Sequence, residues 1–199
     1  MKKLLHVGCG PNRKENTIKY FDDSWSEVRL DINEDAKPDI IGSMTDLSNV
    51  EKNSYDAVFS SHSIEHLFAH EVEIALKEFY SVLNEDGFVV ITCPDLKSVS
   101  KLVIEDKLYE KAYDSPSGPI SPIDMIYGHR GFIQKGDHYM SHKSGFTLKN
   151  LLGVLKHCGF QSVAGIERPN VFDLWVVAKK QNIDQNNFKN FVHSVLKTI

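Results

Sequence analysis

The sequence predicts an α/β fold: a doubly wound, mainly parallel sheet with helices on both faces. Short apolar runs alternate along the chain with segments whose apolar residues recur every three or four positions. The runs at residues 4–7 and 88–92 are apolar on both sides, as in strands that are covered on both faces. At 199 residues, 41% hydrophobic and 25% charged, the chain fits a single globular domain over residues 1–199.

The predicted strands are short apolar or alternating runs bounded by turn residues. They cover residues 4–7, 27–31, 39–41, 55–59, 88–92, 160–166 and 171–178. The clearest is 88–92, which the turn signal at residues 84–87 precedes.

Helices are predicted where apolar positions follow the helical period. They cover residues 71–83 and 97–113, a segment that Thr147 caps and Gly159 ends, and a C-terminal helix within residues 184–199. The terminal helix is interpreted mainly as a packing element, with a dimer contact as the alternative. We therefore expect a monomer or a homodimer.

Residues 114–146 follow neither period and are rich in proline and glycine, so we expect an irregular insert that covers a substrate. The net charge of the chain is −4, but residues 127–150 carry +3 and contain three of the nine histidines. The acidic average argues against nucleic acid as a general partner. The basic segment instead suggests an acidic substrate.

Three widely spaced cysteines form no CxxC pair, which favours neither a zinc site nor a disulfide framework. A reducing, cytoplasmic location fits this pattern best. The apolar start of the chain stops at Gly8, too early for a secretory signal, and no segment is long and apolar enough to span a membrane. No membrane partner is expected.

A strand that runs directly into Gly8-Cys9-Gly10 indicates a nucleotide cradle, because glycine lets the backbone approach a ligand closely. Arg13 stands where a dinucleotide fingerprint needs its third glycine, and no phosphate-binding GK[ST] follows. Asp31 ends the next strand and is placed to accept hydrogen bonds from ribose hydroxyls. The alternatives are a purely structural glycine turn and a loop aspartate that faces water.

A second motif follows the strand at residues 55–59: two serines, then His62-x-x-Glu65-His66. His62 and His66 have the spacing of metal ligands on a helix, but the order differs from His-Glu-x-x-His and no third ligand is near in sequence. We therefore expect no metal at this motif, and His66 is interpreted as a packing or capping residue.

Taken in order, these motifs resemble those of class I S-adenosylmethionine-dependent methyltransferases. The resemblance covers residues 3–96 and includes Leu83-Asn84-Glu85-Asp86-Gly87 and Cys93-Pro94-Asp95-Leu96. A narrower resemblance, to small bacterial predicted methyltransferases of type 11, extends to about residue 180. The segments that carry it are Tyr127-Gly128-His129, residues 142–147 and Cys158-Gly159-Phe160. Those proteins often accompany surface-polysaccharide genes. The resemblance implies a Rossmann-like, seven-stranded sheet and S-adenosylmethionine as cofactor, with S-adenosylhomocysteine as product.

The resemblance also implies roles for individual residues. The methionine part of the cofactor would be held by the loop after the first strand and by the end of the fourth: Gly8, Cys9, Gly10, Ser60, Ser61 and His62. Asp31 would bind the ribose, and the adenine would lie against Ile32, Ser43 and Met44. This chain has Asn12 in place of a frequent third glycine. It also has Ser43 in place of an aspartate, so a carboxylate contact to the adenine amine is doubtful.

Methyl transfer from a sulfonium to oxygen or nitrogen requires a positioned nucleophile and, for many acceptors, a base near neutral pKa. His62 and His142 are the predicted catalytic residues; the alternatives are cofactor packing for His62 and a surface loop for His142. The expected acceptor is a small molecule, with an anionic molecule and a sugar derivative as candidate classes. The residues predicted to bind it are Tyr127, His129, Arg130, His142 and Lys143. A cofactor-binding protein without activity and an NAD-binding oxidoreductase remain alternative functions.

Overall fold

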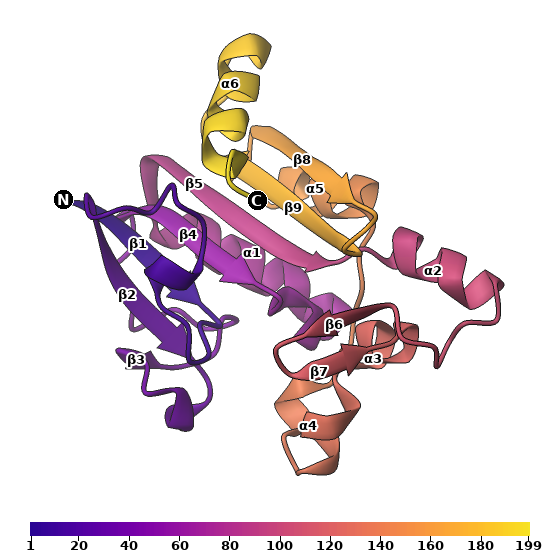
Figure 1. Ribbon diagram of the computed structural model, residues 1–199. Coiled ribbons are helices and arrows are strands. Elements are labelled where there is room, and N and C mark those ends of the chain that lie inside the picture. Colours follow the sequence, from indigo (N-terminus) through magenta and orange to yellow (C-terminus); the bar gives the residue numbers. More distant parts are fainter.

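A computed structural model describes all residues from Met1 to Ile199 and contains the expected seven-stranded sheet, in the order β3-β2-β1-β4-β5-β9-β8 (Figure 1). Its strands are β1 (Lys2–Val7), β2 (Trp25–Asp31), β3 (Ile40–Ile41), β4 (Tyr55–Ser61), β5 (Leu83–Pro94), β8 (Ser162–Arg168) and β9 (Asp173–Lys179). The first five are parallel, and β9 runs antiparallel between β5 and β8. The predicted fold class is confirmed.

The strand order reverses at the centre of the sheet. β1 pairs with β2 on one side and with β4 on the other, so the chain leaves β1 and β4 in opposite directions. In open parallel sheets, a crevice forms at this point beyond the carboxyl ends of the strands. The glycine loop after β1 and the serine–histidine segment after β4 therefore meet at one edge.

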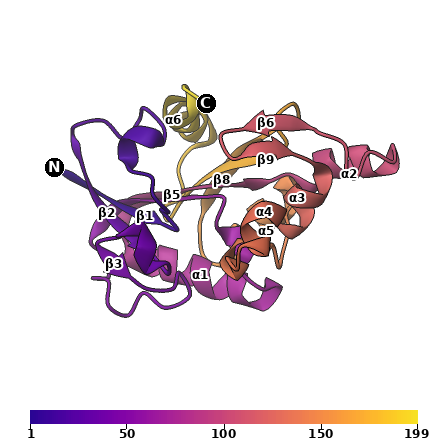
Figure 2. The same cartoon turned by 60° about the horizontal axis from the view of Figure 1, so that its bottom comes forward.

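Helices α1 (Ala69–Val82) and α5 (Leu148–His157) cover one face of the sheet, and α6 (Gln185–Leu196) covers the other (Figure 2). The larger core, of 26 buried residues, lies under α1 and α5. The apolar positions predicted for α1 are buried in it, among them Val72, Leu76 and Phe79. Thr147 caps α5 as expected, with its hydroxyl accepting from the Asn150 amide.

Only one turn of 3-10 helix, η1 (Lys14–Asn16), joins β1 to β2, so this connection covers little of the sheet. The C-terminal helix covers the face of the sheet that this connection leaves open. Phe188 and Val192 of α6 belong to a second core of 13 buried residues, which includes Phe59 and Phe88 of the sheet. This packing agrees with the role predicted for the terminal helix.

Two boundaries differ from the sequence prediction. The turn signal at residues 84–87 lies inside β5, where the pairing with β4 shifts register, so it marks a bulge. Helix α2 (Leu96–Ile104) begins at the capping Asp95 but ends well before residue 113, and Asp106 adopts a left-handed φ of 59°. A non-glycine residue in this conformation breaks a helix.

The insert at residues 114–146 is not irregular as expected. It contains a hairpin and short helices: β6 (Tyr113–Ser115), β7 (Gly118–Ile120), α3 (Pro122–Tyr127), α4 (Arg130–Gln134) and a 3-10 turn, η4 (His138–Met140). Elements of three to six residues are too short for a periodic pattern to reveal them. Figure 1 shows them beyond the end of the sheet toward which β4 and β5 point. None of the helices has the length and apolar character that a membrane crossing needs.

Candidate active site

The loop after β1 uses its two glycines differently. Both have a left-handed φ, 64° at Gly8 and 50° at Gly10. A Cβ on Gly8 would lie 2.3 Å from Ser63 Oγ, whereas a Cβ on Gly10 would meet nothing within 4 Å. Gly8 is therefore required for packing against the segment after β4, and Gly10 leaves open space where a ligand can approach the backbone.

Asp31, at the end of β2, ties this loop to the next one. Its Oδ2 accepts a hydrogen bond of 2.7 Å from the Gly10 amide, and its Oδ1 accepts one of 2.8 Å from the Asn33 amide. An ionised carboxylate has about four acceptor positions, so two stay available for hydroxyls of a ligand. The acid is thus oriented beside the glycine loop, as the ribose role requires.

Arg29 is a positioning residue that the sequence analysis missed. It is buried, and its guanidinium donates to the carbonyl oxygens of Gly10, Asn12, Ala36 and Lys37 at 2.6–3.1 Å. These carbonyls belong to the loops after β1 and after β2. One buried side chain therefore fixes both loops, and no local sequence pattern distinguishes it from an ordinary strand arginine.

A pocket of about 400 Å³ lies beside the glycine loop. Four of the predicted cofactor residues line it: Gly8, Cys9, Ser61 and His62. Ser60 does not, because side chains alternate along β4 and its own is fully buried on the opposite face. The prediction that the Ser60 side chain flanks the cofactor is therefore not supported by its position.

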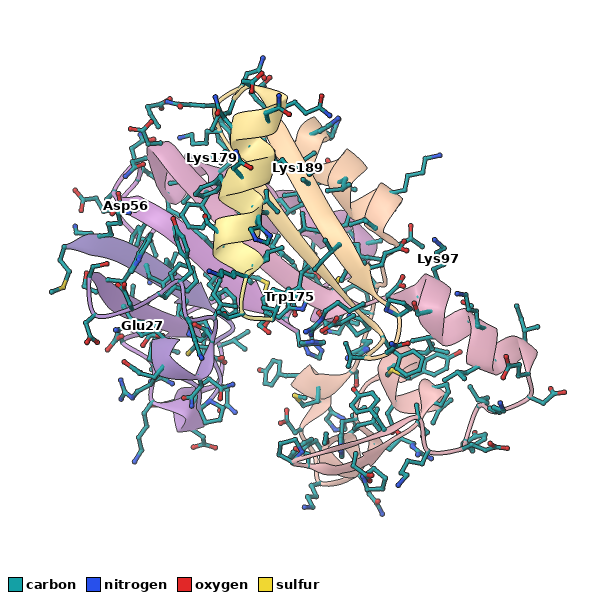
Figure 3. All side chains as sticks on the ribbon, turned by 45° about the horizontal axis from the view of Figure 1, so that its top comes forward. Glu27, Asp56, Lys97, Trp175, Lys179 and Lys189 are labelled. Carbon is teal, nitrogen blue, oxygen red and sulfur yellow. The ribbon has the colours of Figure 1, made fainter.

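Other pocket residues were not predicted: His6, Arg168, Trp175 and Thr198 are among them. His6 Nδ1 lies 2.8 Å from Glu27 Oε1; burial lowers the pKa of His6 although Glu27 opposes this. Trp175 projects from β9 near the end of α6 (Figure 3), and the Arg168 guanidinium lies 5.2 Å from its ring centre. The pocket therefore combines an aromatic wall with polar groups.

The residues expected to hold the adenine lie outside this pocket, on the β2 and β3 side of the glycine loop. Ile32 is half-exposed directly after Asp31. The Gly42 amide donates to the Asp31 carbonyl, which brings Ser43 and Met44 to the same edge. The methyl carbon of Met44 would lie 3.6 Å from a Cβ on Gly8.

His62 begins the segment after β4 with a left-handed φ of 49°, and its amide donates to the Thr92 carbonyl. Such backbone strain in a non-glycine residue is concentrated at functional sites. Its side chain is half-exposed, and its Nδ1 lies 3.5 Å from Glu65 Oε1. Burial opposes a charge on His62, but Glu65 and Asp173 raise its pKa overall.

The insert places His142 behind this segment. Its ring centre lies 4.9 Å from that of His66, and its Nδ1 lies 2.9 Å from the Met125 carbonyl oxygen. Burial lowers the pKa of His142. Burial would raise the pKa of Glu65, but the surrounding histidines lower it overall. The two predicted catalytic histidines therefore lie on either side of a buried acid that the sequence analysis did not assign to the site.

The structure does not gather the other residues predicted to bind substrate. Arg130 donates to the buried Asp124 at 2.7 Å and to Ser121, which fastens α4 to α3. His129 packs against Phe132, and Tyr127 is exposed. Lys143 is also exposed, with its Nζ 5.0 Å from the centre of the Phe68 ring. Among the five, His142 and Lys143 adjoin the segment between β4 and α1 with their side chains, at His66 and Phe68.

Residues 5–91 match the sequence family described as a methyltransferase domain. Several solved structures share the fold. A methyltransferase from Archaeoglobus fulgidus that depends on S-adenosylmethionine is 19% identical over 90% of this chain and 86% of its own, with a TM-score of 0.57. The 1,6-didemethyltoxoflavin-N1-methyltransferase of Burkholderia thailandensis, solved with S-adenosylhomocysteine, is 13% identical over 90% and 71%, with a TM-score of 0.55.

The CMeT domain of the citrinin polyketide synthase is 11% identical over 92% of this chain, with a TM-score of 0.59, and the chain spans about half (47%) of that structure. No curated protein matches the sequence. The family match covers less than half of the chain, and the structures, at 11–19% identity, show a shared fold; both findings agree with the resemblance to class I S-adenosylmethionine-dependent methyltransferases. They also agree with S-adenosylmethionine as the cofactor.

Proposed function

We propose that this protein transfers the methyl group of S-adenosylmethionine to an oxygen or nitrogen atom of a small molecule. The observation that carries the proposal is the glycine loop, tied to Asp31 and adjoining a pocket that reaches His62. In this arrangement the loop and Ser61 hold the methionine part of the cofactor. Asp31 binds the ribose, and the adenine lies against Ile32 and Met44.

The cofactor supplies the reactive methyl group, so the protein mainly has to position the acceptor and remove its proton. His62 is the better placed of the two predicted bases, because its half-exposed side chain lines the pocket. His142 keeps its Nδ1 bonded to a backbone carbonyl and is more enclosed. We therefore assign proton transfer to His62 and a supporting role to His142.

The acceptor is proposed to enter from the side of the insert, whose segment 127–150 carries +3. This charge favours an anionic acceptor, and a phosphorylated or acidic sugar derivative is one class that fits. Arg130 is engaged by Asp124, so Lys143 is the more available cation of the pair that the sequence analysis proposed. Equal affinity for neutral and anionic analogues at low and high salt would contradict this part of the proposal.

A thermal-shift titration with S-adenosylmethionine, S-adenosylhomocysteine and NAD tests the cofactor. We expect both sulfur compounds to raise the Tm and NAD to leave it unchanged. Stabilisation by NAD alone would favour the oxidoreductase. A methyl-transfer screen against sugar nucleotides and small acids then tests activity, and binding of cofactor without transfer to any acceptor would favour the non-catalytic alternative.

A further inference from the structure

The carboxylate of Glu65 is buried without a hydrogen-bond partner on either oxygen, and only 1% of the residue is exposed. Burying an ionised carboxylate is costly unless a cation or hydrogen-bond donors compensate it. The groups around it are imidazoles, which are also common metal ligands. Glu65 is therefore in an environment that a bound cation would complete.

Two histidines and this acid form a compact ligand set. One ligand atom each from Glu65, His66 and His142 lies within 4.8 Å of the others. Metal bonds of about 2.0–2.2 Å in a tetrahedral site place ligand atoms roughly 3.3–3.6 Å apart. The ligand atoms would therefore have to approach one another by at most about 1.5 Å.

Each of the two histidines has a carbonyl oxygen beside one ring nitrogen. His66 Nδ1 lies 3.2 Å from the Ser141 carbonyl oxygen, and His142 Nδ1 lies 2.9 Å from the Met125 carbonyl oxygen. A carbonyl only accepts, so a hydrogen bond to it places a proton on Nδ1, and in a neutral imidazole Nε2 is then the nitrogen with the lone pair. Histidine ligands of metals typically donate their other ring nitrogen to a carbonyl or carboxylate in this way.

The backbone holds the two segments together. Glu65 and His66 belong to a turn of 3-10 helix, η3 (Ile64–His66), and His142 comes from the insert. The amides of Lys143 and Ser144 both donate to the Glu65 carbonyl, at 2.8 and 3.1 Å. The ligand set is therefore fixed by main-chain contacts and does not depend on flexible side chains alone.

We propose that Glu65, His66 and His142 bind one divalent transition-metal ion, of which Zn²⁺, Mn²⁺ and Co²⁺ are suitable probes. Two imidazoles and one carboxylate suit such ions and leave coordination positions open. His62 lies 3.5 Å from Glu65 and also lines the pocket, so an acceptor oxygen bound to the metal would lie next to the proposed base. A metal ion lowers the pKa of an oxygen that it binds. This revises the expectation of no metal, because the third ligand comes from the insert.

The test uses protein without an affinity tag, stripped of metal with a chelator and then titrated with each ion in the absence of cofactor. We expect one equivalent bound per chain, a visible absorption band for Co²⁺, and a Tm rise of roughly 5–10 °C at 100 times the Kd. Glu65→Gln and His142→Ala should each abolish the band and the shift. His138→Asn, an exposed histidine of the same insert, is the matched control and should retain both.

Glu65→Gln also separates metal binding from folding. It removes a buried acid whose oxygens accept no hydrogen bond, so in the metal-free state we expect its Tm to equal or exceed that of the metal-free wild type. Failure of the wild type to bind any of the three ions stoichiometrically would overturn the proposal, as would equal binding by wild type and Glu65→Gln. The affinity for S-adenosylhomocysteine is measured separately, so failure of the methyltransferase proposal would leave this result unaffected.

Discussion

Asp31 accepts a 2.7 Å hydrogen bond from the amide of Gly10, which lies 21 residues earlier in the chain. The bond joins the end of β2 to the loop after β1, two parallel neighbours whose carboxyl ends share an edge. A nucleoside bound there would contact a carboxylate already oriented by the protein, so less side-chain freedom is lost on binding.

Replacing Asp31 with Ala should weaken binding of S-adenosylhomocysteine about 10- to 150-fold. A hydrogen bond to a charged group contributes roughly 1.5–3 kcal/mol, and each 1.4 kcal/mol changes Kd tenfold. Isothermal titration calorimetry measures the change. Asp23→Ala, which alters a fully exposed acid, should bind like the wild type. An unchanged Kd for Asp31→Ala would remove Asp31 from the cofactor site.

Replacing Arg29 with Met should lower both stability and cofactor affinity. The apolar side chain occupies similar space but leaves carbonyls of the two loops without donors, and one unsatisfied buried group costs about 1–3 kcal/mol. We expect a Tm lower by several degrees. Arg13→Met, at an exposed position of the loop that follows Gly10, is the control. If Arg29→Met binds cofactor more weakly but unfolds at the wild-type Tm, Arg29 orients the two loops at the site without contributing to the stability of the fold.

The two glycines of the loop should respond differently to alanine. Gly8→Ala and Gly10→Ala both place a side chain at a left-handed φ, which costs about 1–2 kcal/mol. Gly8→Ala adds a clash with Ser63, so we expect it to be the less stable of the two in urea unfolding. Both variants should bind S-adenosylhomocysteine more weakly, and equal stabilities would contradict the packing role of Gly8.

Asp124→Asn should loosen the insert in a pH-dependent manner. Burial would raise the pKa of Asp124, but hydrogen bonds from Arg130 and Ser121 lower it overall. A pKa below the unfolded value of about 3.9 stabilises the fold above that pH, and the stabilisation is lost as the pH falls toward the folded pKa. The Tm difference from wild type should therefore be constant from pH 7 to 5 and shrink below about pH 4.

Asp114→Asn is the matched control for this pH series, because Asp114 is an exposed acid of the same insert that pairs with Lys111. Exposed ion pairs contribute little to stability, so its Tm should follow the wild type at each pH. Amide hydrogen exchange in residues 122–134 shows whether the loss in Asp124→Asn is local. An undiminished difference at low pH would mean that the charge of Asp124 is not the cause.

Much of the proposed cofactor site follows from the local sequence. Gly8, Gly10 and Asp31 directly follow apolar strands, and parallel strands bring their carboxyl ends to one edge wherever they pair. Position near a strand end does not decide which side chains reach the site, because successive side chains of a strand point to opposite faces of the sheet. Ser60 and Ser61 are equally close to the end of β4, but only Ser61 faces the pocket.

Contacts between distant segments had no local signal. The local sequence around Arg29 does not differ from that of an exposed strand arginine, because its partners are carbonyls of two separate loops. The helices of the insert are too short to give a periodic pattern. His62, Glu65 and His66 are one motif in the sequence, but the motif lacked a third metal ligand. His142 supplies it from 76 residues beyond His66, because amides of the insert bond to the Glu65 carbonyl.

By itself, the sequence determined the alternating α/β pattern, the glycine loop and the acid that ends β2, because periodicity and turn residues act within a few positions of the chain. The tertiary structure decided the order of the strands, the cover that α6 gives to the second face, and the meeting of Glu65 with His142. Those relationships depend on which surfaces pack together, and packing joins residues irrespective of their distance in sequence.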